Sequence, residues 1–184
     1  MRKSQFILVS QLKQKLQEFP GIVSSLEKKD PHFIDKTMLW LKSSEDILST
    51  YTISEVSEIA GFRSKIIAAK MTEGRGINIK KNQIKEASGI LYDIQNTVLT
   101  VLTPYEKKIN ECREIVKQLL VLTAQTHTQI YNPSLPFEDF IKRIWLYILS
   151  ENDLRMGAIK LKSVLSEMDI LMLIGDEIEL SDFT

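Results

Sequence analysis

Apolar residues recur at helical spacing from Asn82 to Tyr131, and this pattern constrains the fold more than any other feature of the sequence. The steps between them alternate between three and four residues, which places them along one face of a helix. This seam consists of Ile84, Ala87, Leu91, Ile94, Val98, Val101 and Tyr105. A helix of this kind is stable only when the seam is buried, so the stretch predicts packing against other helices.

Pro104 divides this stretch, because proline lacks the N–H that a helix interior needs but is tolerated at the first position of a helix. Thr103 and Glu106 beside it have the spacing of a capping box. We therefore predict a helix over about 83–102 and a second over about 104–131. The alternative is one long helix that is kinked at Pro104.

The remainder of the chain also has helical periodicity, and no stretch of useful length alternates as a strand does. The predicted fold is all-α, an up-and-down bundle of six to eight helices with a long central pair broken near Pro104. We expect a single domain over 1–175 and an acidic C-terminal tail over 176–184, which is extended or loose.

Several residues have the chemistry of helix ends. Pro20 and Gly21 predict the end of the first helix, and Asp30 before Pro31 is a candidate N-cap for the next. Thr52, with Glu55 three residues later, predicts another N-cap. Ser166 is the expected cap of the last helix.

Composition limits the kind of protein. The 184 residues include 24 basic and 24 acidic side chains, so overall charge gives no strong attraction to nucleic acid or membrane. The only cysteine, Cys112, lies on an apolar stripe, which predicts a buried thiol and suits a reducing compartment. No apolar run approaches the length of a membrane span. We expect a cytoplasmic protein without membrane contact.

The sequence carries no recognisable catalytic or cofactor motif. His32 and His127 are the only histidines, and with one cysteine they do not make a zinc set. Phosphate-binding and dinucleotide-binding glycine motifs are absent as well. We therefore expect no metal, no cofactor and no catalytic residue. An enzyme would need a composite site, such as Glu45 with Arg63 and His127; the alternative for Glu45 is a partly exposed position or an ion pair with Arg63 or Lys65.

Charge is distributed unevenly along the chain. From Arg63 to Lys85 there are seven basic residues and one acid, whereas Leu165 to Thr184 holds six acids and no base. The basic region could bind phosphates, dock the acidic tail, or be an ordinary solvated surface. The candidate contact residues are Arg63, Lys65, Arg75, Lys80, Lys81 and Lys85.

These observations favour a non-catalytic helical module that acts through protein–protein contacts and that could self-associate as a homodimer. The seam and the basic region are the surfaces we expect to carry those contacts. One alternative is an accessory protein that binds nucleic acid through residues 63–85. Another is a helical enzyme of unknown reaction.

Overall fold

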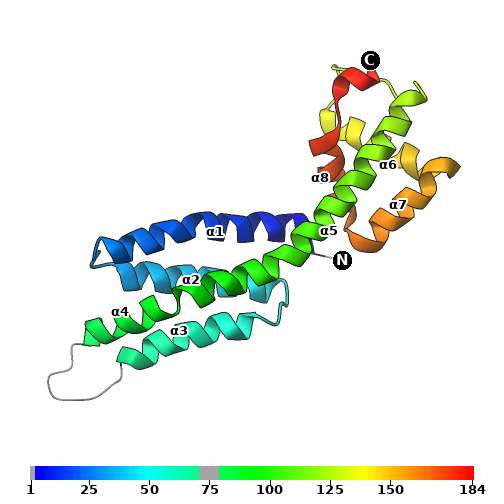
Figure 1. The fold of residues 1–184 in the computed structure, drawn as a ribbon. Helices are drawn as coiled ribbons and strands as arrows, with labels where there is room; N and C mark the ends of the chain where they lie inside the picture. Colours follow the sequence, from blue (N-terminus) through cyan, green and yellow to red (C-terminus); the bar gives the residue numbers. More distant parts are fainter. Residues whose placement is uncertain (1–2, 71–78) are drawn as a thin grey trace. The chain divides into compact units, whose positions relative to one another are not determined.

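The computed structural model describes residues 3–70 and 79–184, and within them it contains helices and no strand. The predicted all-α fold and the number of helices are confirmed. The elements are α1 (Gln5–Glu27), α2 (Phe33–Thr50), α3 (Val56–Lys70), α4 (Ile79–Gly89), α5 (Leu91–Gln125), α6 (Phe137–Ser150), α7 (Asn152–Val164), α8 (Glu167–Glu177) and the 3₁₀ turn η1 (Leu180–Phe183) (Figure 1).

The chain divides into two compact units. The N-terminal unit is Ile7–Pro104, and the C-terminal unit is Tyr105–Thr184 together with the described residues before Ile7. Helix α5 contributes its first part to the N-terminal unit and its second part to the C-terminal unit. The single domain expected over 1–175 stays a prediction, because two compact units can belong to one folding domain.

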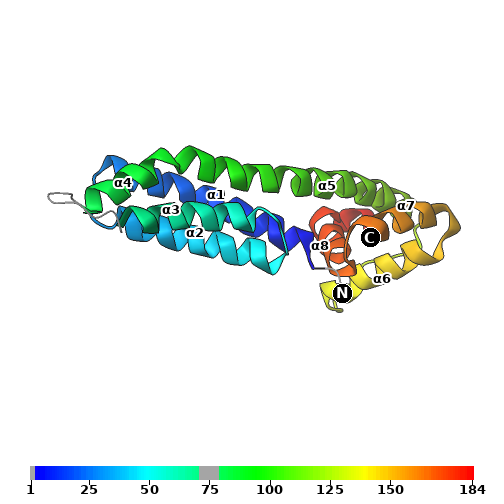
Figure 2. The same cartoon turned by 90° about the horizontal axis from the view of Figure 1, so that it is seen from below.

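In the N-terminal unit, helices α1 to α4 lie alongside one another, and successive helices run in opposite directions (Figures 1 and 2). Trp40 of α2 packs edge-on against Phe19 of α1, with ring centroids 5.3 Å apart. The indole N–H of Trp40 also donates to the carbonyl oxygen of Lys15 at 2.9 Å. The core of this unit includes Leu12, Leu41, Leu48, Ile59, Phe62, Ile66, Ala87, Ile94 and Val98. Each large apolar side chain buried in this way contributes roughly 1.5–3 kcal/mol to stability.

The C-terminal unit packs α6, α7 and α8 with the second part of α5. Helix α6 contacts both α7 and α8. Two glycines allow close approach between helices: a Cβ at Gly157 would lie 2.9 Å from Leu119 Cδ2, and one at Gly175 would lie 3.0 Å from Ile141 Cδ1. The core of this unit includes Ile109, Val116, Phe140, Ile144, Trp145, Ile148, Leu161, Leu173 and Ile174.

The predicted break at Pro104 is wrong, and the chain continues there as one helix; the kink that the alternative included stays a prediction. Helix α5 continues through Pro104, and the interruption lies at Ile90, between α4 and α5. Pro104 is on the exposed side of the helix, where the carbonyl that lacks a donor can be hydrated. Thr103 does not cap a new helix, because its hydroxyl donates to the carbonyl oxygen of Leu99 at 2.8 Å.

Pro20 likewise does not end the first helix. Helix α1 continues through it to Glu27, and Pro20 is exposed as Pro104 is. Sequence patterns show that a proline removes one hydrogen bond, but they do not show whether the affected carbonyl faces solvent.

Ser166 caps α8 as predicted. Its hydroxyl oxygen accepts from the backbone N–H of Asp169 at 3.2 Å, and the Asp169 carboxylate accepts from the backbone N–H of Ser166 at 3.4 Å. This reciprocal pair is a capping box. Asp30 does not cap α2; its carboxylate accepts from the backbone N–H of His32 at 2.8 Å, within the turn before the helix.

Thr52 was expected to start a helix, and instead it ends one. Its φ is 58°, in the left-handed region, and its N–H donates to the Ser49 carbonyl oxygen at 3.0 Å. The N–H of Ile53 donates to the Leu48 carbonyl oxygen, also at 3.0 Å. These two bonds form the Schellman motif that usually places glycine at the Thr52 position. The expected capping box with Glu55 is therefore wrong.

The same motif ends α1, with Lys29 in the left-handed conformation at a φ of 52°. The N–H of Lys29 donates to the Leu26 carbonyl oxygen at 3.0 Å, and that of Asp30 donates to the Ser25 carbonyl oxygen at 2.8 Å. Lysine at this position is less stable than glycine because its Cβ crowds the backbone.

Asp169 holds the start of α1 within the C-terminal unit. Its carboxylate is fully buried and accepts from the backbone N–H groups of Gln5 and Phe6, at 3.1 and 3.2 Å. The hydroxyls of Ser4 and Ser166 also donate to it. A carboxylate at the start of a helix is favoured by the free N–H groups and the helix dipole.

The residues expected to form a loose acidic tail are packed against the C-terminal unit. Phe183 of η1 is buried and lies edge-on to Phe140, with ring centroids 5.6 Å apart. The carbonyl oxygen of Phe183 accepts from the backbone N–H of Tyr131 at 2.7 Å. The last residues of α8 and the 3₁₀ turn are therefore part of the fold.

Candidate functional site

The first candidate residue, Arg63, forms an ion pair and does not present a free charge. Its Nε lies 2.9 Å from Glu45 Oε2, and its Nη2 lies 3.3 Å from Glu45 Oε1, so α3 is joined to α2. The ion pair that the sequence suggested for Glu45 is confirmed. Lys65 is exposed, and its Nζ lies 5.6 Å from the centroid of the Phe62 ring. The side chains of Arg63 and Lys65 therefore interact with other residues of the N-terminal unit.

The other basic candidates lie on α4 or in the segment before it. Lys80 and Lys81 are in the first turn of α4 and are exposed, as is Lys85 one turn later. Arg75 lies outside the described residues. Lys80 and Lys81 stand where the positive end of the helix dipole disfavours cations, and no acid occupies this first turn.

The fold brings a second group of lysines to the same end of the N-terminal unit. The turn between α1 and α2 lies at the end where α3 finishes and α4 begins (Figures 1 and 2). Lys28 and Lys29 are exposed in that turn, and Lys70 is exposed at the end of α3. We call Lys28, Lys29, Lys70 and Lys80 the basic tip. Lys28 and Lys29 are not recognisable as candidates in the sequence, because they are far from the basic region along the chain.

No acid among residues 3–70 and 79–184 forms an ion pair with a lysine of the basic tip. The nearby Lys36 differs, because its Nζ lies 2.7 Å from Asp30 Oδ2. That hydrogen bond, followed by the one from the His32 backbone, lowers the pKa of the Asp30 carboxyl. The basic tip therefore offers positive charge that no ion pair among the described residues of its unit neutralises.

The acidic C-terminal residues have cationic neighbours of their own. Glu177 forms an ion pair with Arg113, and its Oε2 lies 3.7 Å from Lys117 Nζ. Asp176 Oδ2 lies 3.8 Å from Arg113 Nη2. These contacts are all within the C-terminal unit, so these two acids are held by α5 and not by the basic region that the sequence suggested.

The helical seam is not an available binding surface. Ala87, Leu91, Ile94, Val98 and Val101 are buried within the chain itself, and the two end residues of the seam are half-buried. A partner could reach these side chains only by opening the core, so the seam is excluded as a docking surface of the folded chain.

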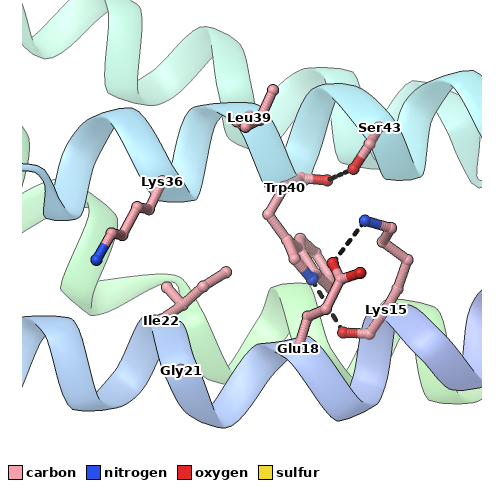
Figure 3. A pocket seen from close by; sticks show the side chains of 8 residues that line it. All are labelled: Lys15, Glu18, Gly21, Ile22, Lys36, Leu39, Trp40 and Ser43. Carbon is pink, nitrogen blue, oxygen red and sulfur yellow. Dashed lines mark hydrogen bonds and ion pairs between the residues drawn. The ribbon is translucent and has the colours of Figure 1, made fainter.

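A surface hollow of about 360 Å³ lies between α1 and α2 (Figure 3). It is lined by Lys15, Glu18, Gly21, Ile22, Lys36, Leu39, Trp40 and Ser43. Its polar side chains are already engaged: Lys15 Nζ lies 2.6 Å from Glu18 Oε2, and Trp40 donates to the Lys15 carbonyl oxygen. Trp40 itself is buried, so it forms a closed floor and leaves no deep apolar pocket.

A second hollow, of about 430 Å³, lies between α6 and α8 and opens to solvent. Ile141 of α6 and three residues of α8 give it an apolar floor, and Glu138 and Lys142 of α6 stand beside it. The α8 residues are Met168, Leu171 and Met172. We call this feature the α6–α8 groove. Met168 remains 47% exposed, so the groove offers an apolar surface that the unit does not cover.

Cys112 and His127 are the remaining candidate residues from the sequence. Cys112 is buried, as predicted, and burial raises the pKa of its thiol, which makes it a poor nucleophile. His127 is exposed just after α5 and belongs to the C-terminal unit, whereas Glu45 and Arg63 belong to the N-terminal unit. In residues 3–70 and 79–184, no three His, Cys, Asp or Glu side chains converge as metal ligands would.

Comparison with protein-family models, with curated proteins and with solved structures finds no match for this chain. In the part of the chain that the structure describes, no helix combines the length and the apolarity needed to cross a membrane. The α6–α8 groove and the basic tip are the two surfaces of the described residues that could bind a partner.

Proposed function

We propose that this chain is a non-catalytic helical interaction module that binds an amphipathic helix of another protein in the α6–α8 groove. The observation that supports the proposal is the apolar floor formed by Ile141, Met168, Leu171 and Met172, of which Met168 is 47% exposed. A channel between two helices suits a third helix that inserts side chains spaced by three, four and seven residues. Methionines favour this role because their flexible side chains adapt to the shape of a partner.

The size of the groove favours a helix of another protein over a second copy of this chain. A stable dimer buries about 800 Å² on each partner and involves about 20–30 residues a side. Six residues line the groove, which is enough for the anchor side chains of one helix and too few for a dimer interface alone. The possibility of a homodimer is decided by the experiment below.

The charges beside the groove give the partner helix a preferred direction. Glu138 and Lys142 are one turn apart on α6 and carry opposite charges. A bound helix would therefore place a basic residue near Glu138 and an acidic one near Lys142. Such rim charges add little affinity but disfavour the reversed orientation. We further propose that the module works in the cytoplasm, which the single buried thiol supports.

A displayed library of helical peptides, selected against the whole immobilised chain, tests this proposal. We expect the selected peptides to be amphipathic and to lose at least about tenfold in affinity with Met168→Lys. Met156→Lys is the matched control, because Met156 is also an exposed methionine of the C-terminal unit but lies on α7. Equal binding to both variants would refute the proposed site.

Sedimentation of the unliganded chain gives the competing outcome. The proposal expects a monomer over the concentrations used in the binding assay. A dimer that Met168→Lys dissociates and Met156→Lys leaves intact would assign the groove to a second copy, and would overturn binding of a helix from another protein.

A further inference from the structure

Independently of the groove, we propose that the basic tip binds the phosphate backbone of double-stranded nucleic acid without reading its sequence. Four lysines from three separate places in the chain are exposed at one end of the N-terminal unit (Figures 1 and 2). Ion pairs within the described residues do not neutralise them. Phosphates spaced along a duplex are the anionic partner that a group of separate lysine ammonium groups suits.

Two lysines of the basic tip occupy positions where another residue would be more stable. Lys29 occupies a left-handed position that favours glycine, and Lys80 lies in a helix turn where an acid would be preferred. Thr52 and His127 are also left-handed, so the conformation of Lys29 alone does not indicate binding. What distinguishes the tip is that two unfavourable lysines lie in one cluster that no ion pair of the described residues neutralises.

The surroundings of the tip favour a duplex over single strands. Single-strand binding uses exposed aromatic rings on which bases stack. Phe33, at the start of α2, is buried, and neither Lys70 nor Lys80 has an aromatic residue next to it in the described sequence. Contacts would therefore be electrostatic and strongly salt-dependent. Four phosphate contacts predict a slope of about −3.6 for the logarithm of the binding constant against that of salt concentration.

The double variant Lys29→Gly with Lys80→Glu tests the proposal without weakening the fold. Glycine suits the left-handed position, and glutamate suits the start of α4, so both changes favour folding. The probe is a short, fluorescently labelled DNA duplex of arbitrary sequence, and the readout is anisotropy over a range of salt concentrations. We expect affinity to fall by at least about tenfold and the slope to fall to about −1.8.

The control variant is Lys107→Gln with Lys108→Glu, which changes the net charge by the same amount at two exposed lysines of α5. Equal losses in the two variants would show that only net charge matters, and would refute the proposed tip. Absence of duplex binding by the wild-type chain at low salt would also refute it. So would tighter binding of the wild-type chain to phosphatidylserine vesicles than to the duplex, because the tip would then be a membrane contact.

Discussion

Replacing Asp169 with alanine should strongly destabilise the C-terminal unit. The carboxylate accepts from the Ser4 and Ser166 hydroxyls and from three backbone N–H groups, two of them at the start of α1. A hydrogen bond to a charged group is worth about 1.5–3 kcal/mol, but such values do not add within one network. Since some donors can be hydrated once the carboxylate is gone, we expect a loss of about 3–5 kcal/mol.

The two tryptophans allow this loss to be measured in the correct unit. Trp145 is buried in the C-terminal unit, and Trp40 is buried in the N-terminal unit. In a Trp40→Phe background, urea unfolding followed by tryptophan fluorescence reports on the surroundings of Trp145. With a slope of about 2 kcal/mol per molar urea, the midpoint should fall by roughly 1.5–2.5 M.

The matched control is Asp153→Ala, which removes an exposed acid from the first turn of α7. That residue can interact with the helix dipole, so its loss should cost at most about 1 kcal/mol. Asp169→Asn keeps the size of the side chain and one acceptor oxygen, and should fall between the two variants. If Asp169→Ala unfolded at the same urea concentration as Asp153→Ala, the buried carboxylate would not anchor α1, and the reasoning would be refuted.

Three further outcomes are expected. Gly157→Ala should lower the free energy of unfolding by about 1–2 kcal/mol, because the new Cβ would overlap Leu119. Gly61→Ala, whose Cβ meets only open space, should raise it by about 0.5–1 kcal/mol. Chemical denaturation measures both, and equal effects would contradict the close approach at Gly157. A double-mutant cycle on Glu45 and Arg63 should give a coupling of about 0.5–1 kcal/mol that decreases in high salt, and zero coupling at low salt would contradict the ion pair. Lys36→Gln should raise the pKa of Asp30 toward its ordinary value. The lowered pKa stabilises the fold at pH values above the ordinary pKa, and this stabilisation is lost as pH falls through the lowered pKa, so the variant should retain less of it. An NMR titration of the Asp30 carboxyl measures the shift, and an unchanged titration would contradict the role of Lys36.

Periodicity was sufficient to predict the fold class. The apolar seam of residues 84–105 was predicted from spacing alone, and its central members are buried as a seam must be. Spacing does not say which neighbour covers a stripe. The same pattern fits a core helix and a docking helix, which is why the seam was wrongly expected to serve as a binding surface.

Helix-capping rules predicted the structure correctly where residues close in sequence determine it. Ser166 and Asp169 form a capping box with each other, and this pairing needs no information from the rest of the fold. At Pro20, Thr52 and Pro104 the outcome depended on packing. Neither proline ends its helix, and both lie on exposed faces, whereas Thr52 is held in a left-handed turn after α2 despite its branched Cβ.

The candidate sites show the same limit. The basic region from Arg63 to Lys85 is visible in the sequence, but the convergence of Lys70 and Lys80 with Lys28 and Lys29 is a consequence of tertiary structure. The α6–α8 groove could not be predicted, because Ile141 and Met168 are separated by a whole helix and two turns. Glu138, Lys142 and the α8 residues carry no motif that would have identified them.

Methyl NMR of the methionines tests helix binding at the groove most directly. The chain has six methionines, of which Met168 and Met172 line the groove and Met156 is exposed elsewhere on the C-terminal unit. When a selected amphipathic peptide is added to the whole protein, the methyl signals of Met168 and Met172 should shift in proportion to occupancy, and that of Met156 should not move. Unchanged signals from Met168 and Met172 under saturating peptide would contradict the proposed function.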